Sequence, residues 1–262
     1  MREKPEEIRR EFLYGRHAVH EALRAGRRRI YRLLIAEGLQ PKPILEALIA
    51  LAEGRGIPIT RVPKARLDAI AEGHQGVVAE VEPYPYMDFE TAWQESARRP
   101  DPPFWLALDC LQDPQNFGTL LRTAEAVGVH AVIFPEHRSA RVTPAVVNAS
   151  AGAVEHLAVV QVTNMARALE ALKERGVWVV GLQQDPRAIR YDRADLTGPI
   201  ALVVGSEETG IRPLVRRACD LLIYLPMGGR VASLNAAAAG SVALYEIARR
   251  RGFGEGNSGP AP

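Results

Sequence analysis

Beyond residue 103 the chain alternates between short apolar runs and segments with helical periodicity, and this alternation restricts the possible folds more than any other feature. Apolar runs of about five to seven residues are typical of strands whose two faces are both covered. Because a helical segment separates each run from the next, neighbouring strands are expected to be parallel, which predicts an α/β fold. The expected strands are 103–109, 131–135, 157–162, 177–182, 199–205 and 221–226. The expected helices are 116–127, 144–149, 165–175, 212–217 and 233–251.

The first 80 residues alternate in the same way on a smaller scale and predict a separate small α/β domain. Its expected helices are 17–25, 43–53 and 64–71, and its expected strands are 30–36, 57–62 and 76–81. A stretch rich in proline, aromatic and acidic residues predicts a linker with one helix at 89–97, and a glycine-rich polar stretch predicts a disordered tail. The expected organisation is an N-terminal domain at 1–80, a linker at 81–103, a C-terminal domain at 104–251 and a tail at 252–262.

Composition argues against several classes of protein. A hydrophobic content of 47% is sufficient for a core, yet no apolar run reaches the length of about 18 residues that a membrane span needs. The first residues lack the apolar segment of a signal peptide. Cys110 and Cys219 do not form a C-x-x-C pair, which suits a reducing compartment and argues against a structural zinc site. We therefore expect a cytoplasmic protein with no membrane segment and no metal.

Positive charge is concentrated at the N-terminal end. Residues 1–35 contain ten Lys or Arg and five Glu, and residues 81–103 contain two Arg and five acids, although the whole chain has a net charge of only +2. A basic segment beside a near-neutral remainder indicates an anionic polymer such as RNA as the partner. The same charges also fit an ordinary solvated surface, so both interpretations stay open on charge alone.

Three blocks of polar and glycine residues follow expected strands of the larger domain: NFGTLLR at 116–122, GSEETG at 205–210 and PMGGRVASLN at 226–235. Open parallel sheets bind ligands at the carboxyl ends of their strands, so these loops are expected to form a ligand site. Glycines in the third block free its backbone to wrap a ligand, and Ser233 could cap the helix that follows. These residues also fit an ordinary strand-to-helix loop.

In this order and spacing the blocks resemble the SpoU, or TrmH-like, family of RNA ribose 2′-O-methyltransferases, which belongs to the SPOUT class. The family pattern N-x-G-x-x-x-R is matched by Asn116, Gly118 and Arg122. The pattern G-x-E-x-x-G is matched by Gly205, Glu207 and Gly210, and the pattern P-M-x-G…S-L-N by Pro226, Met227, Gly229, Ser233, Leu234 and Asn235. The sequences GRHAVHEAL near the N-terminus and HQGVVA at 74–79 are similar to the members that modify 23S ribosomal RNA.

The resemblance implies a C-terminal parallel sheet with a deep trefoil knot, a small N-terminal RNA-binding domain and S-adenosylmethionine as the cofactor. It implies an enzyme that methylates a ribose 2′-hydroxyl, with a guanosine of 23S rRNA as the expected target. A tRNA ribose methyltransferase of the same family and a non-catalytic RNA-binding or ribosome-assembly factor are the alternatives. A homodimer paired across the knot region is expected, and the small residues at 236–240, Ala243 and Ala248 would give the last helix a surface for close packing.

In the family, backbone groups of the loops after two adjacent strands hold the cofactor. The corresponding residues here are Gly205, Leu225, Met227, Gly228 and Leu234. The residues that the resemblance marks as catalytic are Asn116, Arg122, Glu207, Ser233 and Asn235. Because a guanidinium group has a pKa above about 12, we expect Arg122 to hold the target phosphate and stabilise the developing alkoxide rather than act as a base. Considered alone, Arg122 would be a surface arginine paired with Glu125 or Glu136, and Asn116 and Ser233 would be helix caps.

The N-terminal domain resembles the small RNA-binding domain of these enzymes. Arginine side chains pair well with phosphates, and the expected phosphate contacts are Arg16, Arg27, Arg28, Arg29 and Arg32. His74 and Gln75 precede an expected strand and are expected to contact a base that is splayed out of its stack. For each of these residues an ordinary surface role is the alternative.

Overall fold

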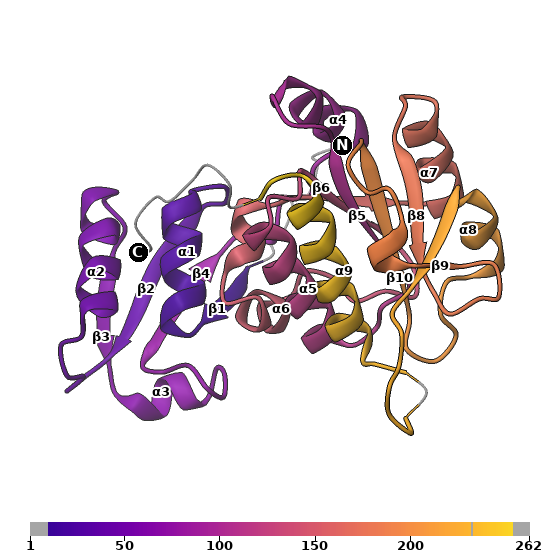
Figure 1. Cartoon of the computed structure of the whole chain (residues 1–262). Coiled ribbons are helices and arrows are strands. Elements are labelled where there is room, and N and C mark those ends of the chain that lie inside the picture. Colours follow the sequence, from indigo (N-terminus) through magenta and orange to yellow (C-terminus); the bar gives the residue numbers. More distant parts are fainter. Residues whose placement is uncertain (1–9, 232, 254–262) are drawn as a thin grey trace, which may run out of the picture. The chain divides into compact units, whose positions relative to one another are not determined.

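The computed structural model describes residues 10–231 and 233–253, and its contacts divide the chain into two compact units. The first unit combines Met1–Pro85 with Val142–His156, and the second combines Tyr86–Arg141 with Leu157–Pro262. Each unit has a sheet of its own (Figure 1). The segment Val142–His156 lies in the range expected for the C-terminal domain, yet it packs with the N-terminal unit. The chain therefore passes from one unit to the other three times.

The first unit contains a four-stranded sheet with the strand order β1-β4-β2-β3. β4 (Val77–Val81) pairs antiparallel with β1 (Glu11–Tyr14) and with β2 (Ile30–Ala36), and β3 (Ile59–Val62) is parallel to β2. All residues of β4 are buried because this strand lies between two others. The sequence does not predict β1, which is short and whose strand character depends on its pairing with β4.

Helices of the first unit come from two parts of the chain. They are α1 (Arg16–Ala25), α2 (Pro43–Gly54), α3 (Lys64–Asp68), α6 (Pro144–Ala149) and the 3-10 helix η1 (Ala153–His156). The Asn148 amide of α6 donates to the Tyr14 carbonyl at 3.1 Å, and the Tyr84 hydroxyl donates to the Val154 carbonyl at 3.0 Å. These hydrogen bonds fasten the segment Val142–His156 to the N-terminal sheet.

The second unit contains a seven-stranded sheet with the order β7-β6-β5-β10-β8-β11-β9, and its neighbouring strands are parallel. This confirms the predicted α/β fold. The strands are β5 (Phe104–Asp109), β6 (Ala131–Pro135), β7 (Ala158–Val162), β8 (Trp178–Leu182), β9 (Ile189–Arg190), β10 (Ile200–Gly205) and β11 (Leu221–Tyr224). Only β9, at the edge, is not predicted from the sequence. The trefoil knot implied by the resemblance stays a prediction.

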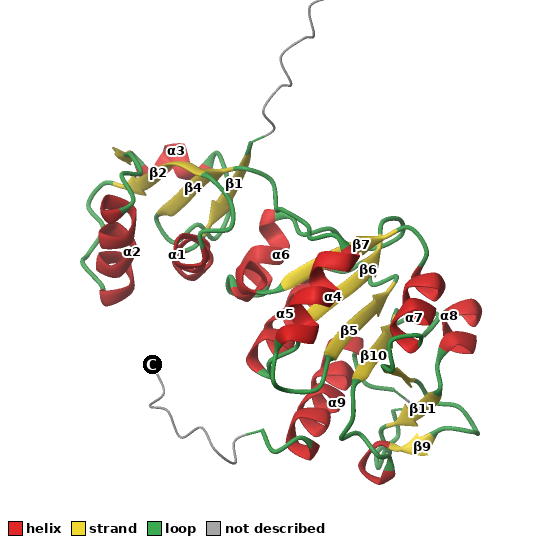
Figure 2. Cartoon of the chain, turned by 90° about the horizontal axis from the view of Figure 1, so that it is seen from above, coloured by secondary structure: helices red, strands yellow, loops and turns green. Residues whose placement is uncertain are grey.

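Helices lie on both sides of this sheet (Figure 2). On one side, α4 (Phe89–Arg98), α7 (Met165–Lys173) and α8 (Pro213–Ala218) share a hydrophobic core with residues of β5, β6, β7, β8 and β10. Trp105 is fully buried in this core, and its indole N–H donates to the Ser96 hydroxyl of α4 at 3.0 Å. The helix expected within the linker therefore belongs to the second unit.

On the other side, α5 (Pro114–Ala126) and α9 (Ala236–Arg250) pack against each other. Val204 contacts α9 on this side of the sheet. Its neighbour Val203 points to the opposite face, into the core shared with α4, α7 and α8. A Cβ atom at Gly240 would lie 2.6 Å from Leu120 Cδ2, so glycine allows α9 to approach α5 closely. The helix α9 has 15 residues, and no helix in the described ranges is long and apolar enough to cross a bilayer.

Two helices of the second unit are capped by other residues than the sequence suggests. The N-cap of α9 is Asn235, whose carboxamide oxygen accepts from two backbone N–H groups of the first turn at 2.9 and 3.1 Å. Ser233 therefore does not cap this helix. The N-cap of α5 is Asp113, so the side chain of Asn116 is available for contacts with other elements.

Candidate active site

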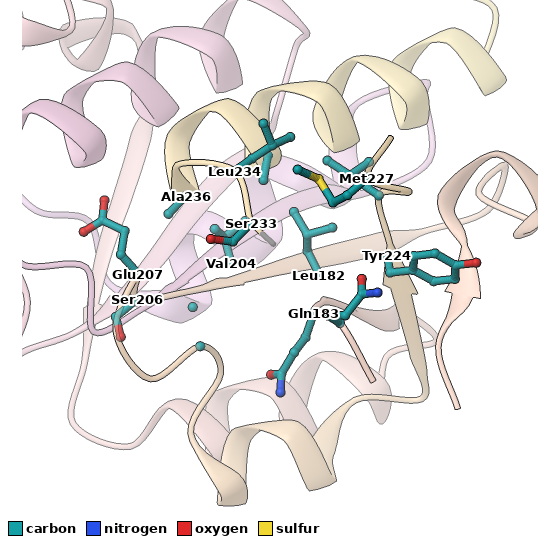
Figure 3. A pocket seen from close by; sticks show the side chains of 15 residues that line it. Leu182, Gln183, Val204, Ser206, Glu207, Tyr224, Met227, Ser233, Leu234 and Ala236 are labelled. Carbon is teal, nitrogen blue, oxygen red and sulfur yellow. The ribbon is translucent and has the colours of Figure 1, made fainter. Parts of the chain in front are cut away.

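A pocket of about 190 Å³ lies at the carboxyl ends of β8, β10 and β11 (Figure 3). Four of the five residues predicted to hold a cofactor line it, namely Gly205, Leu225, Met227 and Leu234. The fifth, Gly228, is exposed and does not line it. Glu207 and Ser233 also line the pocket, as do Gln183 and Tyr224, which the sequence does not single out.

Gly205 allows the loop after β10 to fold back on itself. A Cβ atom at this position would lie 2.2 Å from the Gly210 carbonyl carbon and 2.3 Å from the Ile211 nitrogen. Side chains at such distances from backbone atoms cannot be accommodated, so only glycine fits. The Ser206 N–H donates to the Gly210 carbonyl at 3.2 Å, and the Gly210 N–H donates to the Ser206 carbonyl at 2.9 Å. This closed loop places Ser206 and Glu207 at one end of the pocket (Figure 3).

Residues of the three sequence blocks meet in one hydrogen-bonded chain. The Asn235 Nδ2 donates to the Asn116 Oδ1 at 2.9 Å, and the Asn116 Nδ2 donates to the Glu207 Oε1. The directions are fixed by the helix cap: because Asn235 Oδ1 accepts from backbone N–H groups, its nitrogen must be the donor to Asn116. Asn116 must then present its own nitrogen to Glu207. Glu207 Oε1 is therefore the acceptor at the end of this chain.

Arg122 lies on α5 outside the pocket. It follows Asn116 by six residues, which places it on a different face of the helix and about 9 Å further along. Its side chain is exposed, and it has no hydrogen bond or ion pair with any described residue. The alternative pairing with Glu125 or Glu136 is therefore not present among the described residues. Arg122 is available to a group that comes from outside this chain.

A buried ion pair that the sequence analysis missed joins two loops of the site. Asp109 ends β5 and is fully buried, and it accepts from the Arg212 backbone N–H at 2.8 Å and from Arg212 Nε and Nη2 at 2.8 and 2.6 Å. The hydrogen bond to Asp109 raises the pKa of Arg212. This pair fixes the end of β5 to the chain that follows β10. A charged residue closing the apolar run FWLALD is the signal that could have indicated it.

Arg28 does not fit its predicted role as a phosphate contact. It is only 5% exposed, and its guanidinium pairs with the fully buried Glu155 carboxylate of η1 through Nε, at 3.2 Å, and through Nη2. Its Nη1 also donates to the Glu82 carbonyl at 3.2 Å. The run of three arginines at 27–29 does not reveal which of them faces inward. Arg28 holds the first unit together and is not accessible to RNA.

His74 does not fit its predicted role as a base contact either. It is only 4% exposed, its Nδ1 accepts from the Gly76 N–H at 2.9 Å, and its Nε2 lies 2.9 Å from Asp68 Oδ1. Since Nδ1 is an acceptor, Nε2–H is the donor to Asp68. Both ring nitrogens are used to shape the loop, whereas the neighbouring Gln75 is exposed.

The remaining predicted RNA contacts differ in how accessible they are. Arg29 is exposed, with its guanidinium 5.1 Å from the centre of the Tyr31 ring. Arg32 is paired with Glu80 at 2.5 Å. Arg27 donates to the Tyr84 hydroxyl at 3.3 Å and is half-buried. Arg16 is half-buried as well and donates to the Gln75 carbonyl through Nε at 3.1 Å. These four arginines stay candidates for phosphate contacts.

Comparison with known proteins identifies the family. The SpoU rRNA Methylase family matches residues 103–245, and a family described as RNA 2′-O ribose methyltransferase substrate binding matches residues 12–87. This chain belongs to the SpoU rRNA methylase family. The methylase match covers the closed glycine loop and the Asn116–Glu207–Asn235 chain. The substrate-binding match covers β2, β3, β4 and most of β1. Among residues 10–231 and 233–253, no cluster of three His, Cys, Asp or Glu side chains is placed to hold a metal ion.

Several relatives match almost the whole chain. The 23S rRNA (guanosine-2′-O-)-methyltransferase RlmB of Pseudomonas putida is 43% identical over 92% of this chain and 97% of its own. The TrmH family protein YacO of Bacillus subtilis is 43% identical over 92% of this chain and 96% of its own. The AdoMet-bound rRNA methyltransferase from Sinorhizobium meliloti is a solved structure with 26% identity and a TM-score of 0.75, covering 93% of this chain and 88% of its own.

Proposed function

We propose that this protein transfers the methyl group of S-adenosylmethionine to a ribose 2′-hydroxyl of RNA, with a guanosine of 23S rRNA as the target. Membership of the family and the similarity to RlmB support this activity. One observation in the structure carries the proposal: Asn116, Glu207 and Asn235, from three distant segments, form a single hydrogen-bonded chain at the pocket. A protein that only bound RNA would not need this arrangement beside a pocket at the strand ends.

The pocket suits S-adenosylmethionine, whose adenine ring is apolar on both faces and whose methionine part is charged. Leu182, Val204 and Leu234 supply apolar surface, and Gln183 and Ser206 supply polar groups from adjacent loops (Figure 3). Leu225 adds to the apolar lining. A strand-end pocket of this mixed character is typical of cofactor sites. When bound, the cofactor supplies an electrophilic methyl group on its sulfonium.

The chain's own residues must then orient the ribose and stabilise the charge that develops on O2′. Glu207 is held by Asn116 and accepts hydrogen bonds, so it can orient a ribose hydroxyl at the end of the pocket. Arg122 carries a planar guanidinium, which suits the phosphate next to the target ribose. A fixed positive charge near O2′ stabilises the alkoxide while the proton passes to phosphate or water.

The N-terminal unit supports rRNA over tRNA as the substrate. The solved rRNA methyltransferase from Sinorhizobium meliloti covers 93% of this chain. The tRNA-modifying TrmH/SpoU enzyme of Aquifex aeolicus covers only 62% of it, with a TM-score of 0.53 and 27% identity. The test is transfer of a tritiated methyl group to unmodified 23S rRNA and to unmodified tRNA in parallel. We expect label in 23S rRNA. Label in tRNA alone would show instead that the protein is a tRNA ribose methyltransferase.

We also propose that the working unit is a homodimer formed by the outer face of α9. Gly240, Ala243 and Ala248, three of the small residues expected at this interface, are buried within the chain, whereas Ala238 is exposed. On the same helix Val242 is 43% exposed and Tyr245 is 50% exposed. Large apolar side chains in one exposed patch favour association. Light scattering at micromolar concentration should give about twice the chain mass of 28.7 kDa, and a fully active monomer would contradict the proposal.

We propose a cytoplasmic location for the same enzyme. Cys110 and Cys219 are both free thiols, which suits a reducing compartment. Fractionation of cells should place the protein with the ribosomal material; recovery from an oxidising compartment would argue against this location.

A further inference from the structure

A second hollow, of about 530 Å³, lies within the first unit beside the loop that connects α3 to β4. Its polar lining combines two cations, two carboxylates, one amide and one imidazole, from Arg16, Lys64, Glu37, Asp68, Gln75 and His74. None of these residues lines the cofactor pocket. Glycines form part of the wall, so backbone groups are close to the open space.

Hydrogen bonds of His74 hold the loop beside this hollow in place. His74 accepts from the Gly76 N–H and donates to Asp68, and the Val77 N–H donates to the His74 carbonyl at 2.9 Å. The hydrogen bond from His74 lowers the pKa of Asp68, which also pairs with Lys64 at 3.5 Å. A network of this kind preorganises the side chains above it, because little conformational freedom is left to lose when a ligand binds.

Gln75 is kept in a strained conformation at the mouth of the hollow. Its φ of 52° is in the left-handed region that non-glycine residues rarely adopt. Two hydrogen bonds from Arg16 hold it: the Arg16 N–H donates to Gln75 Oε1 at 3.3 Å, and Arg16 Nε donates to the Gln75 carbonyl at 3.1 Å. With Oε1 thus used, the donor end of the amide, Nε2, is the part of the side chain that can meet a ligand.

The charges in the hollow balance, and this decides what kind of ligand fits. The positive charges of Arg16 and Lys64 are balanced by the carboxylates of Glu37 and Asp68. The hollow therefore has no excess positive charge that would favour binding of a phosphate alone. The Glu37 carboxylate has no ion-pair partner among the described residues. Donors and acceptors set at fixed positions around a hollow match the edge of a nucleobase, which carries both.

We propose that this hollow takes one unpaired base of the RNA substrate, with Gln75, Lys64 and Asp68 contacting its edge. The inference rests on the proposed function, since it names how the N-terminal unit reads the RNA on which the enzyme acts. It also assigns His74 a positioning role beneath the site. A phosphate next to the base would meet Arg16, the arginine that lines the hollow.

Two pairs of matched variants test the site in the full-length protein. Gln75→Gly removes the amide while relieving the left-handed strain, and Gln94→Ala removes an exposed amide from α4. Lys64→Gln and Arg66→Gln each remove one exposed positive charge from α3, but only Lys64 lines the hollow. Affinity for an unmodified 23S rRNA fragment is measured by fluorescence anisotropy at several salt concentrations, and thermal unfolding checks the fold.

Gln75→Gly and Lys64→Gln should each weaken RNA binding about tenfold, and the two controls should bind as the wild type does. Gln75→Gly should leave the salt dependence of binding unchanged, because a base contact releases no counterions. Equal binding by all four variants, with normal methyl transfer to 23S rRNA, would overturn the base pocket and leave the proposed function intact. Absence of methyl transfer by the wild-type protein would overturn the proposed function, and this inference with it.

Discussion

Two arginines of this chain have opposite surroundings, and the surroundings decide what each can do. Arg28 is buried and its charge is neutralised by the Glu155 carboxylate within the first unit, so it is not available to RNA. Arg122 is exposed and makes no ion pair with a described residue, so its charge is available to substrate. The sequence predicts both as functional arginines: Arg122 from its place in the family pattern, and Arg28 from the basic run 27–29, which does not show which of its side chains points inward.

Removal of Arg122 should affect chemistry and leave the fold intact. Arg122→Ala is expected to lower methyl transfer by about 100-fold or more, because a charge that stabilises the developing alkoxide is lost. Arg122→Lys should also fail, since an ammonium cannot make the planar fork. Cofactor affinity, measured by calorimetry, should be unchanged because Arg122 lies outside the pocket. Arg167→Ala, on the exposed side of α7, is the control; equal activity of Arg122→Ala and this control would contradict the assignment.

Removal of Arg28 should do the reverse. Arg28→Met leaves the buried Glu155 carboxylate without its partner and should lower the free energy of unfolding by about 3 kcal/mol. Arg29→Met, at the exposed neighbour, should leave stability unchanged and weaken RNA binding. Urea unfolding followed by circular dichroism separates the two. A stability loss of the same size in both variants would mean that Arg28 is not the buried anchor.

At the scale of elements, the loop after β10 and the packing of α5 on α9 bring the three sequence blocks together. The sequence predicts the helices and the apolar strands well, because a strand that is buried on both faces consists of a continuous run of apolar residues. It fails where a tertiary contact decides the outcome: β1 depends on β4, the cap of α9 is Asn235 and not Ser233, and Asp109 at the end of β5 pairs with Arg212 in the chain after the adjacent strand β10.

The closed loop predicts a sharp effect of one methyl group. Gly205→Ala would place a Cβ atom 2.2 Å from Gly210, so the loop must open and the pocket must lose its end wall. We expect loss of measurable S-adenosylmethionine binding in calorimetry. Gly198→Ala is the matched control, because a Cβ atom there meets no atom within 4 Å. Normal cofactor binding by Gly205→Ala would show that the loop does not form the pocket.

His130 connects α4 to the start of β6 and should make stability depend on pH. Its ring contacts Ser96 at 2.9 Å and Asp101 at 2.7 Å. Burial lowers the pKa of His130 below 6.5; Arg99 and Arg251 act in the same direction, and Asp101 opposes them. Only the unfolded chain then takes up the proton as pH falls through 6.5, so the free energy of unfolding should decrease from pH 7 to 5, by at most about 1.4 kcal/mol per unit. His130→Asn should flatten this slope; an unchanged slope would contradict it.

At the scale of the whole molecule, the segment Val142–His156 complicates any separation of RNA binding from catalysis. This segment interrupts the second unit in sequence, and its Glu155 is buried against Arg28 of the first. Deletion of residues 1–80 would therefore leave Glu155 unpaired, and a loss of activity would have two causes. Periodicity predicts α6 correctly, but no local pattern shows that α6 packs with the N-terminal unit. Point variants in the intact chain are the cleaner test.

The strand-end pocket and the Asn116–Glu207–Asn235 chain form the proposed site of methyl transfer to a ribose hydroxyl of ribosomal RNA. The most direct measurement is mass spectrometric mapping of nucleosides after the protein meets unmodified 23S rRNA and S-adenosylmethionine. We expect one 2′-O-methylguanosine at a single position, absent when Asn116→Ala replaces the wild type. A methyl group on a base, or no methylated nucleoside in 23S rRNA, would contradict it.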